Sequence, residues 1–186
     1  MSLDLTYAKA LYGVACDLSS PMDRLDRLEK ELVEAAQMLA DSKQLHVALV
    51  GPATSSKEKV ALAEEVAKKA GFDELMRRFM IIVARKGRMS HMEDISHAFH
   101  ELRLVAEGGI VGQIYATERP DTELVNKIAA LLGKRINKRV SLRPVVEPRL
   151  LAGIKVTVGN ISYDGSLRVH LQKLRDRIVH DIDIAK

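Results

Sequence analysis

Three histidines near an acidic residue form the pattern in this chain that comes closest to a metal-binding motif. His91, His97 and His100 precede Glu101, in a stretch whose apolar spacing predicts a helix over residues 90–106. His97 and Glu101 are four residues apart and would share one face of that helix. Imidazole and carboxylate groups are ordinary zinc ligands, so a metal-dependent enzyme is one interpretation. The other is that these histidines are solvated side chains, and no known zinc motif surrounds them.

The other groups that could take part in catalysis lack the sequence context that catalysis needs. Gly108-Gly109 is not part of a Gly-x-Gly-x-x-Gly motif that opens a helix, and the chain has no Gly-Lys-Ser/Thr loop for phosphates. Cys16 is the only cysteine, so it cannot form an internal disulfide, and its apolar helical surroundings predict a buried, unreactive thiol. We therefore expect no catalytic residue, no cofactor and no bound metal, and no ATP binding by the isolated chain.

Basic residues are concentrated in the second half of the chain. Residues 1–107 contain 15 Lys and Arg against 17 Asp and Glu, a net −2, whereas residues 108–186 contain 14 against 8, a net +6. A basic half predicts an acidic partner, which could be nucleic acid, an anionic membrane surface or an acidic protein helix. The run KRINKR at residues 134–139 could belong to a nucleic-acid-binding regulatory protein. It could equally be the end of a helix, where the helix dipole favours cations. Aromatic residues for base stacking make up only 4% of the chain, which disfavours nucleic acid.

The first 106 residues predict a bundle of six helices joined by short turns. Ser20-Pro21 is a typical helix start, because serine caps the first turn and proline suits the first helical position. Ser55 with Glu58, and Ser90 with Glu93, have the spacing of capping boxes. The predicted helices cover about residues 4–18, 20–39, 45–49, 55–70, 73–86 and 90–106.

The first and the fifth of these helices are apolar on every side. Such a helix needs cover all round, which a domain of about a hundred residues gives to one central helix more readily than to two. Two interpretations remain open: both helices lie at the centre of the bundle, or they share a groove that accepts an amphipathic partner helix. For the second interpretation, helical spacing selects as outward-facing, protein-binding side chains Tyr7, Leu11, Val14, Phe79 and Ile82.

Helical periodicity stops at residues 107–109, where Glu107-Gly108-Gly109 predicts a linker. Beyond it, alternating apolar residues predict strands, and one helix lies between the first two of them. A last helix from about Ser166, with apolar residues at steps of four, three and four, is expected to fold back onto the final hairpin. The predicted fold class is therefore two-domain: an N-terminal all-α six-helix bundle at residues 1–106, then a small α+β domain at residues 110–186.

Three stretches resemble a known family. EPRLLAGIKVTVGNISYDGSLRVHLQKL, from Glu147, is similar to the C-terminal signature of the delta subunit of F-type ATP synthases, the oligomycin sensitivity conferral protein family. YAKALYGVA, from Tyr7, and RFMIIVARKGRM, from Arg78, resemble the first and fifth helices of that family. The departures from the family pattern are Ala152-Gly153 for a double glycine, Asn160 for an acid, Val169-His170 for Gly-Arg, and Arg78 and Lys86 for asparagine.

The resemblance implies a non-catalytic stator subunit of the F-type ATP synthase that resists rotation during proton-driven ATP synthesis. In that family the first and fifth helices bind the N-terminal helix of an alpha subunit, and the C-terminal domain meets the b subunits of the peripheral stalk. Arg168 and Arg175, with Lys173 and Arg177, are the expected stalk contacts. The implied place is peripheral, at the cytoplasmic face of a bacterial plasma membrane, with membrane contact only through the complex and no nucleic-acid partner.

Overall fold

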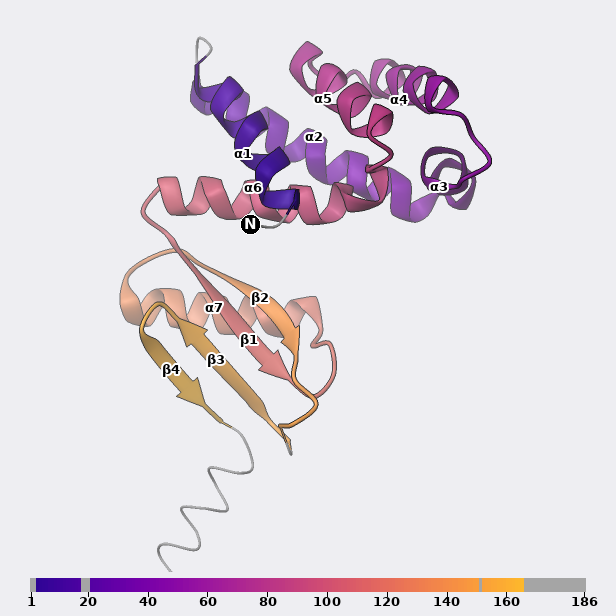
Figure 1. The fold of residues 1–186 in the computed structure, drawn as a ribbon. Coiled ribbons are helices and arrows are strands. Elements are labelled where there is room, and N and C mark those ends of the chain that lie inside the picture. The colour runs from indigo at the N-terminus through magenta and orange to yellow at the C-terminus, as the bar shows by residue number, and fades with distance from the viewer. Residues whose placement is uncertain (1–2, 18–20, 151, 166–186) are drawn as a thin grey trace, which may run out of the picture. The chain divides into compact units, whose positions relative to one another are not determined.

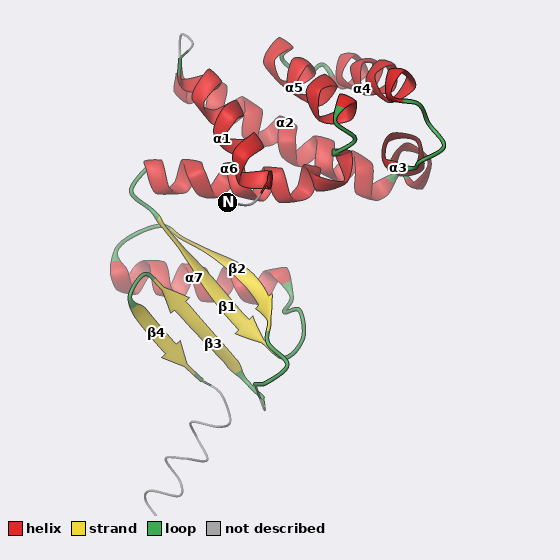
Figure 2. Ribbon diagram, in the orientation of Figure 1, coloured by secondary structure: helices red, strands yellow, loops and turns green. Residues whose placement is uncertain are grey.

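The chain divides into two compact units, Met1–Arg103 and Leu104–Lys186. The computed structural model describes residues 3–17, 21–150 and 152–165. It is mostly helical, with a small four-stranded sheet in the C-terminal unit (Figures 1 and 2). The sequence places the linker at residues 107–109, whereas the division by contacts falls within the last turn of the helix Met92–Ala106.

The N-terminal unit consists of α-helices and one turn of 3-10 helix. In chain order these are α1 (Leu3–Cys16), α2 (Pro21–Asp41), α3 (Lys43–Val50), α4 (Ser56–Ala70), α5 (Glu74–Arg85), η1 (Met89–His91) and α6 (Met92–Ala106). Helix α2 contacts α1, α3 and α5, and α4 packs along α5. The helix starts and ends agree closely with the predicted ones, apart from the additional 3-10 turn.

Local capping explains where several of these helices begin or end. At α4, Ser55 Oγ accepts from the Glu58 backbone N–H at 3.3 Å, and Glu58 Oε2 accepts from the Ser55 N–H at 2.8 Å. The same helix ends at Gly71, whose φ of 73° is the left-handed conformation that glycine adopts without strain. The capping box predicted at Ser90 is wrong, because Ser90 lies inside η1, which leads directly into α6.

The core of the N-terminal unit is apolar and rich in methionine. Its largest fully buried side chains are Phe99, Leu28, Leu32, Leu49, Met76, Met80, Met89, Met92, Ile95 and Val83. One acid is also buried: Glu31 on α2 is 6% exposed. Its Oε1 accepts from Arg27 Nε at 2.8 Å and from the Asp73 backbone N–H at 2.9 Å. Since Asp73 is the N-cap of α5, Glu31 fixes the start of α5 against α2.

The C-terminal unit is a β-α-β unit whose two parallel strands lie side by side, followed by a hairpin. Its elements are β1 (Ile110–Ala116), α7 (Thr122–Ile136), β2 (Val140–Val146), β3 (Ile154–Val158) and β4 (Ile161–Asp164). The strand order is β2-β1-β3-β4, with β1 and β2 parallel and the other pairs antiparallel. Helix α7 covers one face of the sheet (Figure 1), and between them lie Ile114, Val125, Ala129, Leu142, Val156 and Val158. Pro144 is tolerated because β2 is an edge strand.

The last helix and a membrane-spanning helix are the remaining features to compare with the sequence. The predicted last helix, including Arg168 and Arg175, lies outside the described residues. Within the described residues, no helix combines the length and the apolar character needed to cross a bilayer.

We expect a fragment of residues 1–109 to fold by itself, because the N-terminal unit has its own core and its described helices pack on one another. The fragment should unfold in one cooperative thermal transition, which far-UV circular dichroism can follow. A broad, non-cooperative melt would show that this core needs the C-terminal unit.

Candidate protein-binding surfaces

The five side chains predicted to face outward from the first and fifth helices divide into two groups. Val14 and Ile82 are 47% and 49% exposed, and Tyr7 is partly buried. Leu11 and Phe79 are only 3% and 6% exposed, so the prediction that these two face outward is wrong.

Helix geometry explains the error at Leu11. Leu11 is four residues from Tyr7 and three from Val14, and it is equally three from Ala8 and four from Ala15. Leu11 therefore lies both on the stripe of Tyr7 and Val14 and on the stripe of Ala8 and Ala15. Packing decides which stripe is buried, and Ala8, Leu11 and Ala15 form the buried side of α1. Phe79 is buried for the same reason, since it lies on the core stripe of α5 with Met76, Met80 and Val83.

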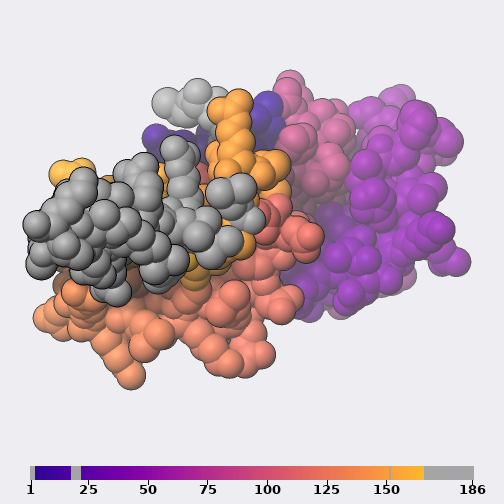
Figure 3. All heavy atoms as spheres, turned by 90° about the horizontal axis from the view of Figure 1, so that it is seen from below, coloured from indigo at the N-terminus to yellow at the C-terminus, as the bar shows by residue number. Residues whose placement is uncertain are grey.

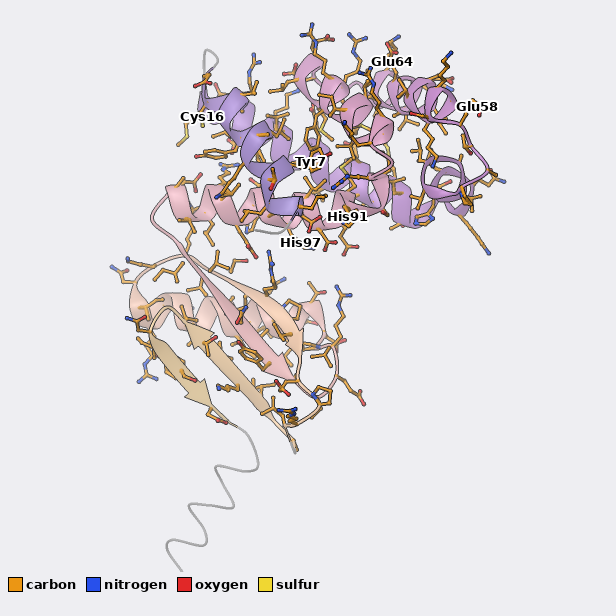
Figure 4. The ribbon with its side chains drawn as sticks, in the orientation of Figure 1. Tyr7, Cys16, Glu58, Glu64, His91 and His97 are labelled. Carbon is orange, nitrogen blue, oxygen red and sulfur yellow. The ribbon has the colours of Figure 1, made fainter. Side chains whose placement is uncertain are left out.

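Tyr7 connects α1 to α5. Its ring meets that of Phe79 edge to face, with centroids 6.3 Å apart, and the Arg88 guanidinium carbon lies 5.9 Å from the Tyr7 centroid. Figure 4 shows Tyr7 on α1, with Cys16 at the other end of that helix. We call the partly or fully exposed side chains of Tyr7, Val14 and Ile82 the α1–α5 surface. The basic side chains of Arg78 and Arg85 are exposed on α5, and that of Lys86 is exposed at its C-cap.

Cys16 is exposed, contrary to the prediction of a buried thiol. It is the last residue of α1, one position beyond the buried Ala15. An apolar stretch of sequence therefore did not determine which way its final side chain points.

The three histidines do not converge on one site. His91 Nδ1 lies 3.0 Å from Asp4 on α1, His97 Nε2 lies 3.8 Å from Glu93 in its own helix, and His100 Nδ1 lies 2.5 Å from Glu29 on α2. Each histidine thus has a different acidic neighbour; His91 ends η1, whereas His97 lies on α6. This arrangement does not support a metal-dependent enzyme that uses His91, His97 and His100 together.

His100 takes part in an ionic network between α2 and α6. Arg103 donates to Glu29 Oε2 at 2.6 Å and also pairs with Asp26. The hydrogen bond to Glu29 raises the pKa of His100 above its ordinary value of 6.5, and the same bond lowers the pKa of Glu29 below 4.5. The protonated histidine and the ionised carboxylate therefore stabilise each other.

This network predicts a pH-dependent contribution to the stability of the N-terminal unit. Because the pKa of His100 is raised in the folded state, its protonation stabilises the fold below pH 6.5, and this stabilisation is lost as the pH rises through the folded-state pKa. Because the pKa of Glu29 is lowered, its ionisation stabilises the fold above pH 4.5, and this stabilisation is lost as the pH falls through the folded-state pKa. His100→Gln should therefore lower the free energy of unfolding most between pH 4.5 and 6.5. Because His100 is half exposed, we expect less than about 1 kcal/mol. Urea unfolding at pH 6 and pH 9 measures this, with His97→Gln as the control; an equal cost at both pH values would contradict it.

The outer side of α7 also exposes apolar side chains. Leu124 and Leu131, seven residues apart, are 45% and 67% exposed, and Lys127 and Lys134 are exposed on the same helix. In the space-filling view, the salmon-coloured spheres of α7 form an open surface on the C-terminal unit (Figure 3). We call Leu124, Lys127, Leu131 and Lys134 the α7 surface.

Part of the basic run at residues 134–139 is occupied by contacts within the C-terminal unit. The Arg135 guanidinium carbon lies 5.6 Å from the Tyr163 ring centroid, and Arg139 pairs with Glu107. Lys134 and Arg135 are in the last turn of α7, where the helix dipole favours cations. These contacts support the interpretation as a helix end over that as a nucleic-acid patch.

The sequence matches the family model described as ATP synthase delta (OSCP) subunit over residues 3–178. The chain belongs to this family. The match spans both units, so the family resemblance of the three short stretches extends over almost the whole chain. Delta-family subunits are non-catalytic parts of the ATP synthase, which agrees with the prediction that this chain is not an enzyme.

Curated relatives support the family assignment, and solved structures share the fold. ATP synthase subunit delta of Caulobacter vibrioides is 30% identical over 169 residues, covering 91% of this chain and 90% of the relative. That of Brevibacillus brevis is 28% identical, covering 89% and 92%. A chain of the Toxoplasma gondii mitochondrial ATP synthase hexamer has a similar fold, with a TM-score of 0.59 at 20% identity, covering 96% of this chain and 98% of that one. A chain of Polytomella F-ATP synthase gives a TM-score of 0.52 at 19% identity, covering 57% and 90%.

Sequence reasoning missed two features of this delta-family chain. One is Glu31, whose spacing of three from Leu28 places an acid on the apolar stripe of α2, a signal that was available. The other is the approach of Asp4 to His91 and Asp94, residues almost ninety positions apart, which spacing within one helix cannot reveal.

Proposed function

We propose that this delta-family chain is the stator link of a bacterial F-type ATP synthase. Residues 1–106 bind the N-terminal helix of an alpha subunit at the catalytic head, residues 107–109 are the linker, and residues 110–186 bind the b subunits of the peripheral stalk. The chain is a peripheral protein on the cytoplasmic face of the plasma membrane. The observation that carries the proposal is the family match across residues 3–178.

On the head side, the α1–α5 surface is the proposed contact. Val14 and Ile82 are half-exposed β-branched side chains on two neighbouring helices, with the ring of Tyr7 between the helices. A partner helix that lays its apolar side on them would cover surface that water now contacts. Leu11 and Phe79 lie beneath this surface in the core, where they support Tyr7 without facing the partner. The exposed cations of α5 favour a partner helix with acidic residues along its edge.

On the stalk side, we propose that the α7 surface contributes together with Arg168 and Arg175. Leu124 and Leu131 are two turns apart on one side of α7, a spacing that suits packing against another helix. The net charge of +6 for residues 108–186 suits acidic segments of the b subunits.

A link under torque has to stay bound at both ends, which calls for tight association. Nanomolar affinity corresponds to about −12 kcal/mol, and two separate interfaces on two units can each be optimised for it. Size-exclusion chromatography of the full chain with intact catalytic head and soluble b segments tests the bridging role. Head and b segments should elute together only when the chain is present; elution together without it, or apart with it, would refute the bridge.

A further inference from the structure

Three side chains in the N-terminal unit form a cluster that the stator role does not use. Asp4 is in the first turn of α1, His91 ends η1 and Asp94 is in the first turn of α6. One potential ligand atom from each residue lies within 4.8 Å of the other two. Asp4 and His91 are partly buried and Asp94 is exposed, so the cluster is open to solvent on one side.

The carboxylate of Asp4 gives an independent sign that this cluster is incomplete. Its Oδ1 atom has essentially no exposed surface and makes no hydrogen bond with the described residues. Its 3.0 Å contact with His91 Nδ1 is an ion-pair contact within the cluster and not a hydrogen bond. A buried carboxylate oxygen without a donor is costly, and such atoms commonly mark a position that an ion or a water satisfies.

We propose that Asp4, His91 and Asp94 bind one divalent transition-metal ion of the zinc class. Metal–ligand bonds of about 2.0–2.1 Å put tetrahedral ligand atoms roughly 3.3 Å apart, close to the separation of Asp4 Oδ1 and His91 Nδ1. Asp94 needs only a side-chain movement, which its exposure permits. The imidazole favours a zinc-class ion over calcium or magnesium, which prefer oxygen ligands alone. Water completes the coordination on the open side.

The bound ion would have a structural role. Asp4 belongs to α1, whereas His91 and Asp94 belong to the segment that begins α6, so the ion ties two regions that are distant in sequence. Tyr7 lies one turn after Asp4, so the ion would also fix the end of α1 that carries part of the α1–α5 surface. Metal binding itself does not rest on the proposed stator function, and the following test involves no partner protein.

Isothermal titration of the full, EDTA-treated chain with zinc chloride tests the site. We expect saturable binding of one ion, and Asp94→Asn or His91→Gln should weaken it at least about 10–100-fold, the range found for loss of a supporting group. Zinc should also raise the melting temperature of the native chain by several degrees, and that of either variant much less.

Two control variants test whether the binding belongs to this cluster. His97→Gln removes another histidine of α6 that lies near an acid, and Cys16→Ser removes the exposed thiol. Neither should change the zinc affinity. Absence of saturable binding, unchanged affinity in Asp94→Asn and His91→Gln, or an equal loss in either control would overturn the proposal.

Discussion

Replacing Leu11 by aspartate is expected to unfold the N-terminal unit. Leu11 is 3% exposed and belongs to the same core cluster as Leu28 and Phe99, so the new carboxylate would lie in an apolar interior without a donor or a cation arranged for it. The expected cost is about 4–5 kcal/mol or more, comparable with the whole stability of many domains. At 25 °C the N-terminal unit of the variant should be unfolded or only partly folded, so that a thermal melt shows no complete transition.

Val14→Asp on the same helix is the matched control. It introduces the same charge and the same helix propensity three residues further on, at a side chain that is 47% exposed. We expect it to cost less than about 1 kcal/mol, as surface substitutions do. Similar melting curves for the two variants would mean that Leu11 is not a core residue.

Ile82→Asp is expected to leave the N-terminal unit folded and to abolish tight binding to the alpha-subunit N-terminal helix. Ile82 is 49% exposed, so its carboxylate is hydrated in the free chain. In the proposed complex that carboxylate loses water without gaining a partner, and losses of 3–5 kcal/mol are typical of an unpaired charge at a buried position. Affinity for a peptide of the alpha N-terminal helix should therefore fall by a factor of about 100 or more.

Val47→Asp controls for the charge itself. Val47 is on α3, outside the α1–α5 surface, and is 56% exposed, close to the value for Ile82. Fluorescence anisotropy with a labelled peptide should give native affinity for Val47→Asp and weak binding for Ile82→Asp. Equal affinities in two folded variants would remove Ile82 from the interface.

Features set by neighbouring residues could be predicted from the sequence. The capping box at Ser55 depends on contacts within a few positions, and it lies where the sequence predicts it. The hairpin between β3 and β4 turns at Gly159, whose φ of 57° suits glycine. Local rules therefore determine where several of the elements start or end.

Features set by packing between distant segments could not be predicted in the same way. Leu11 belongs to two stripes of α1, and only the placement of its neighbours decides which is buried. The pairing of His100 with Glu29 and the approach of Asp4 to His91 each join parts of the chain more than seventy residues apart. The orientation of side chains on an all-round apolar helix is thus the weakest inference that a sequence allows.

Co-sedimentation of the full chain with the catalytic head of a bacterial ATP synthase tests the central claim most directly. Two forms of the head are compared, one intact and one from which the N-terminal segment of the alpha subunits has been removed. The account predicts binding to the intact head with a dissociation constant on the order of nM, and binding to the trimmed head at least about 100-fold weaker. Equal binding to both forms, or no binding to the intact head, would contradict it.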